Sequence, residues 1–159
     1  MAPSEKCQYK DESYDFTCDE PPICQGSKFC IFHDINYLKG DNYEKNKEEV
    51  AKRFEEKLGE YSSNHSPLRF IGYHLPDVSF QGKLLTEELD FNGATFYGRA
   101  DFNGVTFPKG ASFGEATFSG EANFGSAIFS GATRFGSAIF SEVALSFSYI
   151  LRPSILWFS

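Results

Sequence analysis

The stretch DFNGATFYGRADFNGVTFPKGASFGEATFSGEANFGSAIFSGATRFGSAIF, residues 90–140, repeats one short unit along its whole length. The unit is a small residue followed two places later by phenylalanine, with Leu89 and Thr133 as departures at the small position. Successive phenylalanines are alternately five and six residues apart, at positions 91, 96, 102, 107, 113, 118, 124, 129, 135 and 140. This spacing decides the fold.

A helix cannot accommodate the repeat. Steps of five and six residues would scatter the rings around a helix that turns about 100° per residue. Glycine also recurs at almost every turn, and each glycine inside a helix costs about 1 kcal/mol relative to alanine. In an extended chain, by contrast, residues two apart point to the same side, so the small residue and the phenylalanine of each unit face one interior. A glycine follows most of the phenylalanines within three places, where a chain that turns a corner needs positive φ.

Short faces separated by corners predict a solenoid, because no single unit can bury its phenylalanine but stacked coils can. Four faces of alternately five and six residues make a coil of 22 residues. Coils about 4.8 Å apart place successive rings within the favourable range of about 4.5–7 Å. The predicted ring columns are Phe91, Phe113 and Phe135; Phe96, Phe118 and Phe140; Phe102 and Phe124; and Phe107 and Phe129.

The repeat resembles the pentapeptide repeat family. The resemblance implies a right-handed β-helix of square cross-section, with an aromatic residue or leucine at the centre of each face. We therefore expect an all-β solenoid, a right-handed quadrilateral parallel β-helix of about four coils, preceded by a small Cys/His segment and one α-helix. Counting back from Phe91 gives Leu85, Phe80, Leu75 and Phe70 as the centres of a degenerate first coil, so the predicted solenoid domain is 70–159.

Residues 1–40 hold all four cysteines and are predicted to form a zinc-binding segment. Cys30 and His33 are close enough in sequence to bind one ion together, and Cys7, Cys18 and Cys24 are candidates for the two remaining positions of a tetrahedral site. In a reducing cytosol, a cysteine-rich segment too short for a core of its own is more often held by a metal than by disulfides. Two disulfides and free thiols are the alternatives.

The same segment resembles a short Cys/His knuckle at the front of some pentapeptide repeat proteins, which ends here in Phe-Cys-Ile-Phe-His-Asp. That pattern has three cysteines and the histidine. The resemblance implies the ligand set Cys7, Cys18, Cys30 and His33, with Cys24 left over; spacing alone also allows Cys24 in place of Cys7 or Cys18. Because protein groups fill all four positions, such a zinc would be structural.

Residues 41–69 are predicted to form an amphipathic helix and a linker. Asp41 and Glu44 match a capping box, and Gly59 is a natural stop. The narrow apolar stripe is expected to pack on the first coil, with a partner-binding helix as the alternative. It consists of Val50, Phe54, Leu58 and Tyr61.

The sequence contains no nucleotide loop, nucleophile elbow or HExxH motif, and a solenoid filled with phenylalanine offers no cavity for a substrate. We expect His65 and His74 to be solvent-exposed or packing histidines. We therefore predict a non-enzymatic scaffold or protein-interaction module. The alternative, implied by the resemblance, is a DNA mimic that modulates a topoisomerase such as DNA gyrase.

The charge of the chain helps to distinguish the scaffold from the DNA mimic. The net charge is −7, which disfavours direct nucleic-acid binding, since phosphate contacts need clustered Lys and Arg. A DNA mimic needs a dense negative stripe, but residues 70–159 carry five basic and eight acidic side chains. The charge pattern therefore favours the scaffold, with a protein as the partner.

Two further predictions concern the ends of the chain. The N-terminal residues lack the apolar run of a secretory signal, and no apolar run reaches the length of a membrane span, so we expect a cytoplasmic protein without a membrane association. The outward position before each face centre changes from Thr to Ile towards the C-terminus, at residues 128, 139 and 150. In the resembled family this end often joins two chains, so we expect a homodimer. It would be built on Leu151, Ile155, Leu156, Trp157 and Phe158. A tail that caps its own coil, or a longer natural chain, is the alternative.

Overall fold

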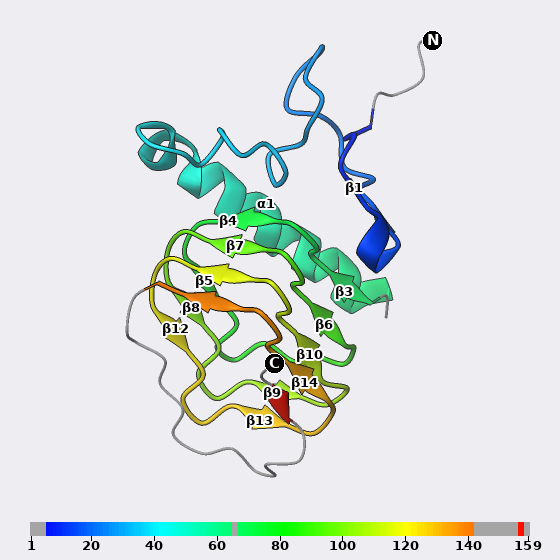
Figure 1. Ribbon diagram of the computed structural model, residues 1–159, viewed down its shortest axis with the longest axis vertical. Coiled ribbons are helices and arrows are strands. Elements are labelled where there is room, and N and C mark those ends of the chain that lie inside the picture. Colours follow the sequence, from blue (N-terminus) through cyan, green and yellow to red (C-terminus); the bar gives the residue numbers. More distant parts are fainter. Residues whose placement is uncertain (1–5, 65–66, 142–155, 158–159) are drawn as a thin grey trace.

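The computed structural model describes residues 6–64, 67–141 and 156–157. It is a solenoid of stacked parallel strands, with helix α1 (Asn42–Asn64) lying across one end (Figure 1). The solenoid strands are β3 (Leu68–Arg69), β4 (His74–Leu75), β5 (Val78–Ser79), β6 (Leu89–Asp90), β7 (Thr95–Phe96), β8 (Ala100–Asp101), β9 (Thr106–Phe107), β10 (Ala111–Ser112), β11 (Thr117–Phe118), β12 (Ala122–Asn123), β13 (Ile128–Phe129), β14 (Thr133–Arg134), β15 (Ile139–Phe140) and β16 (Leu156–Trp157).

The strands form four sheets, one on each side of the solenoid. Their orders are β3-β6-β10-β14-β16, β4-β7-β11-β15, β5-β8-β12 and β9-β13. Ala111 pairs with Leu89 on one side and with Thr133 on the other, so one coil spans 22 residues, as the sequence predicted. The four-sided parallel solenoid is confirmed, and the described strands make about three turns, where four were expected.

The first coil is less regular than the others. Its fourth side, residues 83–86, has no strand, so β9 has a neighbour only in β13 among the described residues. Lys83 stands two residues before the face centre Leu85, a position that faces inward in the regular coils. Its ammonium instead forms an ion pair with Glu55 of α1 at the surface, because burying a lone charge would cost more than giving up a two-residue ladder.

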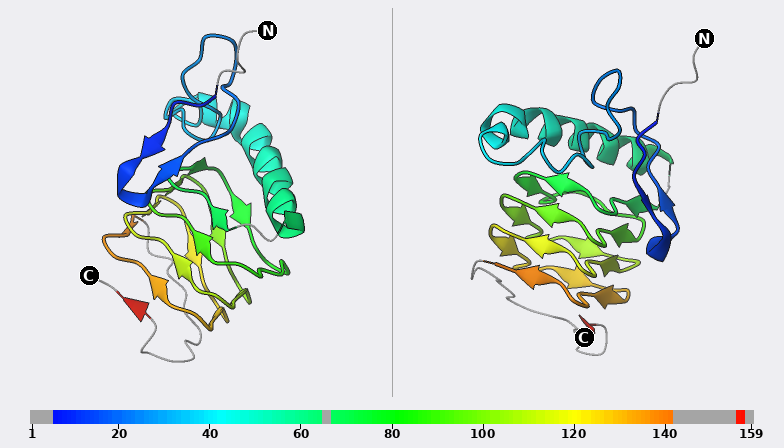
Figure 2. Two further views of the ribbon diagram at one scale, coloured as in Figure 1. Left: turned by 90° about the vertical axis from the view of Figure 1, so that its right-hand side faces the viewer. Right: turned by 45° about the horizontal axis from the view of Figure 1, so that its top comes forward.

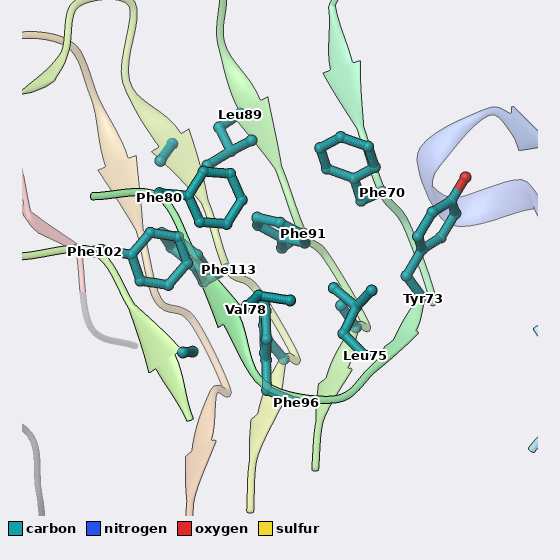
Figure 3. Packing of buried hydrophobic residues seen from close by; sticks show 14 of the residues in the cluster. Phe70, Tyr73, Leu75, Val78, Phe80, Leu89, Phe91, Phe96, Phe102 and Phe113 are labelled. Atoms are coloured by element: carbon teal, nitrogen blue, oxygen red, sulfur yellow. The ribbon is translucent and has the colours of Figure 1, made fainter. Parts of the chain in front are cut away.

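The core consists of stacked phenylalanine rings, and the predicted columns are confirmed. Ring centroids within one column lie 4.7 Å apart between Phe96 and Phe118, and 4.8 Å apart between Phe118 and Phe140, with nearly parallel planes. Figure 3 shows how rings from different sides of the coil fill the interior together. Such offset stacks add to the hydrophobic stabilisation that each buried ring provides.

The corners follow the prediction only in part. Gly104 has a φ of 69°, as expected for a glycine at a corner. At corners of the third coil, however, the left-handed residues are Glu115 and Ser126, with φ of 57° and 55°. Gly120 serves another purpose, since a Cβ there would lie 2.5 Å from the carbonyl oxygen of Gly98 in the coil below. Some glycines are therefore required by close stacking of the coils rather than by positive φ.

Helix α1 covers the open end of the first coil. The ring of Phe54 lies 4.9 Å from that of Phe70, and Tyr61 lies 5.7 Å from Phe70, which confirms the predicted packing of the apolar stripe. The predicted end at Gly59 is wrong, because the helix continues to Asn64. The contact of Tyr61 with the ring of Phe70 stabilises this additional turn.

Among the described segments, no helix has the length and apolar character that a membrane crossing requires.

A small hairpin that the sequence did not predict precedes the helix. Strands β1 (Lys10–Asp11) and β2 (Phe16–Thr17) are antiparallel and joined by the 3-10 helix η1 (Glu12–Tyr14). Figure 2 shows this hairpin beside the solenoid, running along the stack of coils.

At the other end, β16 adds to the sheet that contains β14, with Leu156 paired to Thr133. The backbone at Leu156–Trp157 thus returns to the chain's own last described coil. The other residues predicted for a dimer contact, Leu151, Ile155 and Phe158, lie outside the described residues, as does Ile150.

Candidate metal centre

Three cysteines and one histidine converge between the hairpin, helix α1 and the first coil. Cys7 precedes the hairpin, Cys18 follows it, and Cys30 and His33 lie in the segment that leads to α1. All four are buried, and their ligand atoms lie within 4.8 Å of one another. Cys24 is exposed and stays outside this cluster, where its thiol contacts the hydroxyl of Ser27 at 3.2 Å. The four residues are close enough to bind one metal ion.

The distances fit a tetrahedral ion. The Sγ atoms of Cys18 and Cys30 are 3.8 Å apart, and Nδ1 of His33 lies 3.3 Å from Cys30 Sγ and 3.7 Å from Cys7 Sγ. An ion with metal–sulfur bonds of about 2.3 Å and a metal–nitrogen bond of about 2.0 Å would separate two sulfurs by about 3.8 Å and sulfur from nitrogen by about 3.5 Å. All four cysteines are free, so the predicted alternative of two disulfides is not what this structure contains.

His33 presents the correct nitrogen to the three sulfurs. Its Nε2 lies 3.0 Å from the carbonyl oxygen of Ile71, which can only accept a hydrogen bond. We therefore assign the proton of the neutral imidazole to Nε2, which leaves the lone pair on Nδ1 directed at the cysteines. A backbone carbonyl in this role is the usual outer partner of a metal-binding histidine.

Aromatic side chains hold the imidazole in place. Tyr9 stacks on His33 with ring centroids 3.9 Å apart and planes 9° from parallel, and Tyr73 contacts the ring edge-on at 5.0 Å. Tyr9 can take this position because Gly72 lies beneath it: a Cβ at Gly72 would lie only 2.0 Å from the Tyr9 hydroxyl oxygen. Neither Tyr9 nor Ile71 was predicted from the sequence, and the signal for Tyr9 was the pattern Cys-x-Tyr beside the first ligand.

Local backbone bonds place the ligands. The N–H of His33 donates to the Cys30 carbonyl oxygen at 3.1 Å, a single turn that brings both side chains to one side. The N–H of Cys18 donates to the Tyr9 carbonyl oxygen at 3.1 Å and closes the hairpin. The N–H of Cys30 donates to Cys7 Sγ at 3.3 Å. Such a bond stabilises a thiolate, the form in which cysteine binds metals.

The thiols influence one another strongly. The hydrogen bond from Cys18 lowers the pKa of the Cys30 thiol to about 4, and the neighbouring His33 ring also lowers it. The same bond, together with burial, raises the pKa of Cys18, and burial raises the pKa of Cys7. Without a cation, the buried cluster thus favours one thiolate and disfavours two more. A divalent cation reverses that preference, because a thiol bound to a metal ion is deprotonated.

The cluster is anchored to the solenoid as well as to the hairpin. The bond from His33 to Ile71 reaches the first coil, and the N–H of His74 donates to the Phe32 carbonyl oxygen at 2.8 Å. The ring of Phe32 stacks on Tyr73 at 4.5 Å. The Cys/His segment therefore covers the end of the solenoid together with α1.

The other two histidines lie outside this cluster. His74 is half-buried in β4 and receives a hydrogen bond from the Tyr97 hydroxyl at 3.3 Å, and burial lowers its pKa to about 4. This arrangement agrees with the packing role predicted for it. His65 lies outside the described residues.

These features define a class: a four-sided parallel β-solenoid whose N-terminal end carries a closed Cys₃His cluster. Residues 80–128 match the family model of pentapeptide repeats, with nine copies of the repeat. This match confirms the resemblance of the repeat to pentapeptide repeats that the phenylalanine spacing predicted. Searches of curated proteins and of solved structures returned no match to the chain.

Proposed function

We propose that the protein is a non-enzymatic scaffold that binds another protein on the faces of its solenoid, and that a structural zinc ion holds its N-terminal end together. The ligands would be Cys7, Cys18, Cys30 and His33. The observation that carries the zinc is the set of four buried ligand atoms within 4.8 Å of one another, with the histidine tautomer fixed by Ile71.

The donor set favours zinc over other ions. Three thiolates and an imidazole are soft and borderline ligands that suit tetrahedral zinc, whereas calcium and magnesium prefer oxygen. Protein groups would fill every position, so no site would remain for a substrate or a water molecule. The bound ion would supply positive charge and fixed geometry, and its binding free energy would add to the stability of the folded segment.

The surface of the solenoid supports a scaffold rather than a DNA mimic. Acidic side chains on the coils are paired with basic ones: Arg99 lies 3.1 Å from Asp101 and 3.5 Å from Glu121, and Lys109 lies 2.6 Å from Glu87 in the neighbouring coil. This pairing breaks up the unbroken negative stripe that a DNA mimic would present. Flat faces of short strands with neutralised charges instead suit contacts with another protein.

Metal analysis tests the zinc. Protein purified without chelator should contain about one zinc per chain by elemental analysis. Cys30→Ser should abolish binding, whereas Cys24→Ser, a matched control at the exposed cysteine, should retain it. Zinc that is lost in Cys24→Ser, or retained in Cys30→Ser, would contradict the ligand set.

A supercoiling assay with purified gyrase tests the scaffold against its alternative. We expect neither inhibition nor protection from gyrase poisons at micromolar protein concentrations. Inhibition in this range would favour the DNA mimic.

The free thiols are consistent with the reducing cytoplasm in which we expect the protein to act.

A further inference from the structure

The hairpin between the first two candidate ligands connects the Cys/His cluster to the middle of the solenoid. Residues 8–17, called the strap below, begin directly after Cys7 and end directly before Cys18. Both ends of the strap are therefore fixed at the cluster. The right-hand view of Figure 2 shows the strap running from the helix-covered end along the side of the coils.

The tip of the strap contacts the first and the third coil. The hydroxyl of Tyr14 donates to Oε1 of Glu115 at 3.1 Å. The Arg69 guanidinium donates to the carbonyl oxygens of Tyr14 and Asp15, the latter at 3.3 Å. The same guanidinium lies 5.5 Å from the centre of the Phe16 ring, and its Nε lies 4.0 Å from Oδ2 of Asp90. The strap thus spans two coil boundaries.

The backbone of Glu115 is left-handed, as it is at Ser137 in the same corner one coil later. Glu115 has a φ of 57°, and Gly93 occupies the same corner one coil earlier with a φ of 66°. A side chain in this left-handed conformation costs free energy that glycine would avoid. Glu115 places at this corner a side chain long enough to reach the strap, which a glycine could not do.

Apart from Tyr9, which stacks on His33, and Phe16, which packs against the core, the strap makes few packing contacts. The helix η1 has no buried residue, and Lys10, Ser13 and Thr17 are exposed. A two-stranded hairpin is at best marginally stable when isolated in water. Its position therefore depends on its fixed ends at the cluster and on the few contacts at its tip.

We propose that residues 8–17 form a metal-dependent strap, closed over the corner of Arg69, Asp90 and Glu115 while an ion joins Cys7 to Cys18, and released when the ion is lost. This inference rests on the proposed metal centre. Metal ligation at both ends closes a short loop and removes much of the freedom of the strap. On release, the three charged side chains of the corner lose their contacts with the strap and become exposed to solvent. The cluster thus controls a surface two coils away from it.

Hydrogen exchange of the full-length protein tests the strap. Amide exchange is measured by mass spectrometry on protein with measured zinc content, before and after removal of the ion with a chelator. We expect exchange in residues 8–17 to become at least about tenfold faster, while the peptide around Phe102 and Phe113 stays unchanged.

Two tyrosine variants separate the tip from the cluster. Tyr14→Phe removes only the hydroxyl that contacts Glu115, so we expect zinc content to remain unchanged while exchange in the strap becomes a few times faster. Tyr37→Phe is the matched control, because it removes a similar hydroxyl–carboxylate bond to Glu49, 2.8 Å long, in another part of the chain. It should leave exchange in the strap unchanged.

Each result decides between the two proposals. Bound zinc together with unchanged exchange after its removal would overturn the strap and leave the metal centre intact. Faster exchange throughout the solenoid would also overturn the strap, because it would indicate general unfolding. Protein that never binds zinc would overturn both.

Discussion

The stacked core predicts a large and local effect of removing one ring. Phe113 is fully buried, and the rings above and below it in its column, Phe135 and Phe91, lie 4.9 and 5.8 Å away. The rings of Phe102 and Phe124 lie beside it at 5.4 and 5.5 Å. Because strands on all sides hold these neighbours, they cannot collapse into the space that Phe113→Ala would leave.

The magnitude follows from this rigidity. Replacing a buried phenylalanine with alanine costs about 3–5 kcal/mol, and sites that cannot relax lie at the upper end of that range. The variant also loses favourable ring pairs worth about 0.5–1.5 kcal/mol each beyond their area. We expect Phe113→Ala to lower the free energy of unfolding by about 4–5 kcal/mol.

Urea unfolding followed by far-ultraviolet circular dichroism measures this change. With a urea dependence of about 2 kcal/mol per molar, the midpoint should fall by about 2 M. Thr106→Ala is the control, because Thr106 is exposed on β9; it should change stability by less than about 0.5 kcal/mol. A loss below about 1 kcal/mol in Phe113→Ala, or a larger loss in the control, would refute the inward assignment of the rings.

Three further predictions concern a corner, a titrating group and the C-terminal end. Ser126 has a φ of 55°, so Ser126→Gly should raise the free energy of unfolding by about 0.5–1 kcal/mol, and Gly104→Ala at the same corner one coil earlier should lower it by about 1–2 kcal/mol; equal effects in urea unfolding would contradict the strain argument. Burial lowers the pKa of His74 from 6.5 to about 4, so the unfolded state binds more protons between these pH values and the contribution of the neutral ring is lost as pH falls through that window. His74→Gln should therefore lose less stability than the wild type between pH 7 and pH 4.5, and parallel losses would show that other groups cause the acid dependence. We also propose a homodimer through the C-terminal end, so sedimentation at tens of micromolar should show a dimer that Trp157→Asp disrupts, whereas a monomer at all concentrations would exclude it.

The candidate metal ligands could be predicted from the sequence, but the contacts that join the Cys/His segment to the solenoid could not. The C-x₂-H spacing identified Cys30 and His33, and the resemblance to a knuckle selected two further cysteines that the structure places beside them. Nothing in the spacing could show that Ile71 fixes the tautomer of His33, because these residues meet only when the first coil packs on the Cys/His segment. The contact between Tyr14 and Glu115 has the same origin, since it joins residues 101 positions apart.

The end of helix α1 shows the same limit on a smaller scale. Gly59 is a reasonable local stop, because glycine is a poor helix former. The helix nevertheless continues to Asn64, since Tyr61 gains a contact with the ring of Phe70. The contact between Tyr61 and Phe70 outweighs the low helix propensity of Gly59 and so sets the end of the helix.

The solenoid can be derived from the spacing of residues in the repeat. A repeat in which every unit offers one small and one aromatic residue to the same side leaves no other way to bury the rings, so the 22-residue coil and its columns follow from spacing alone. Contacts between unlike segments depend on the tertiary structure: which cysteines meet, where the hairpin lies, and which corner the hairpin contacts. Periodicity carries information about neighbours one coil apart, whereas the Cys/His segment has no period, and its position depends on the shape and charge of the coil it covers.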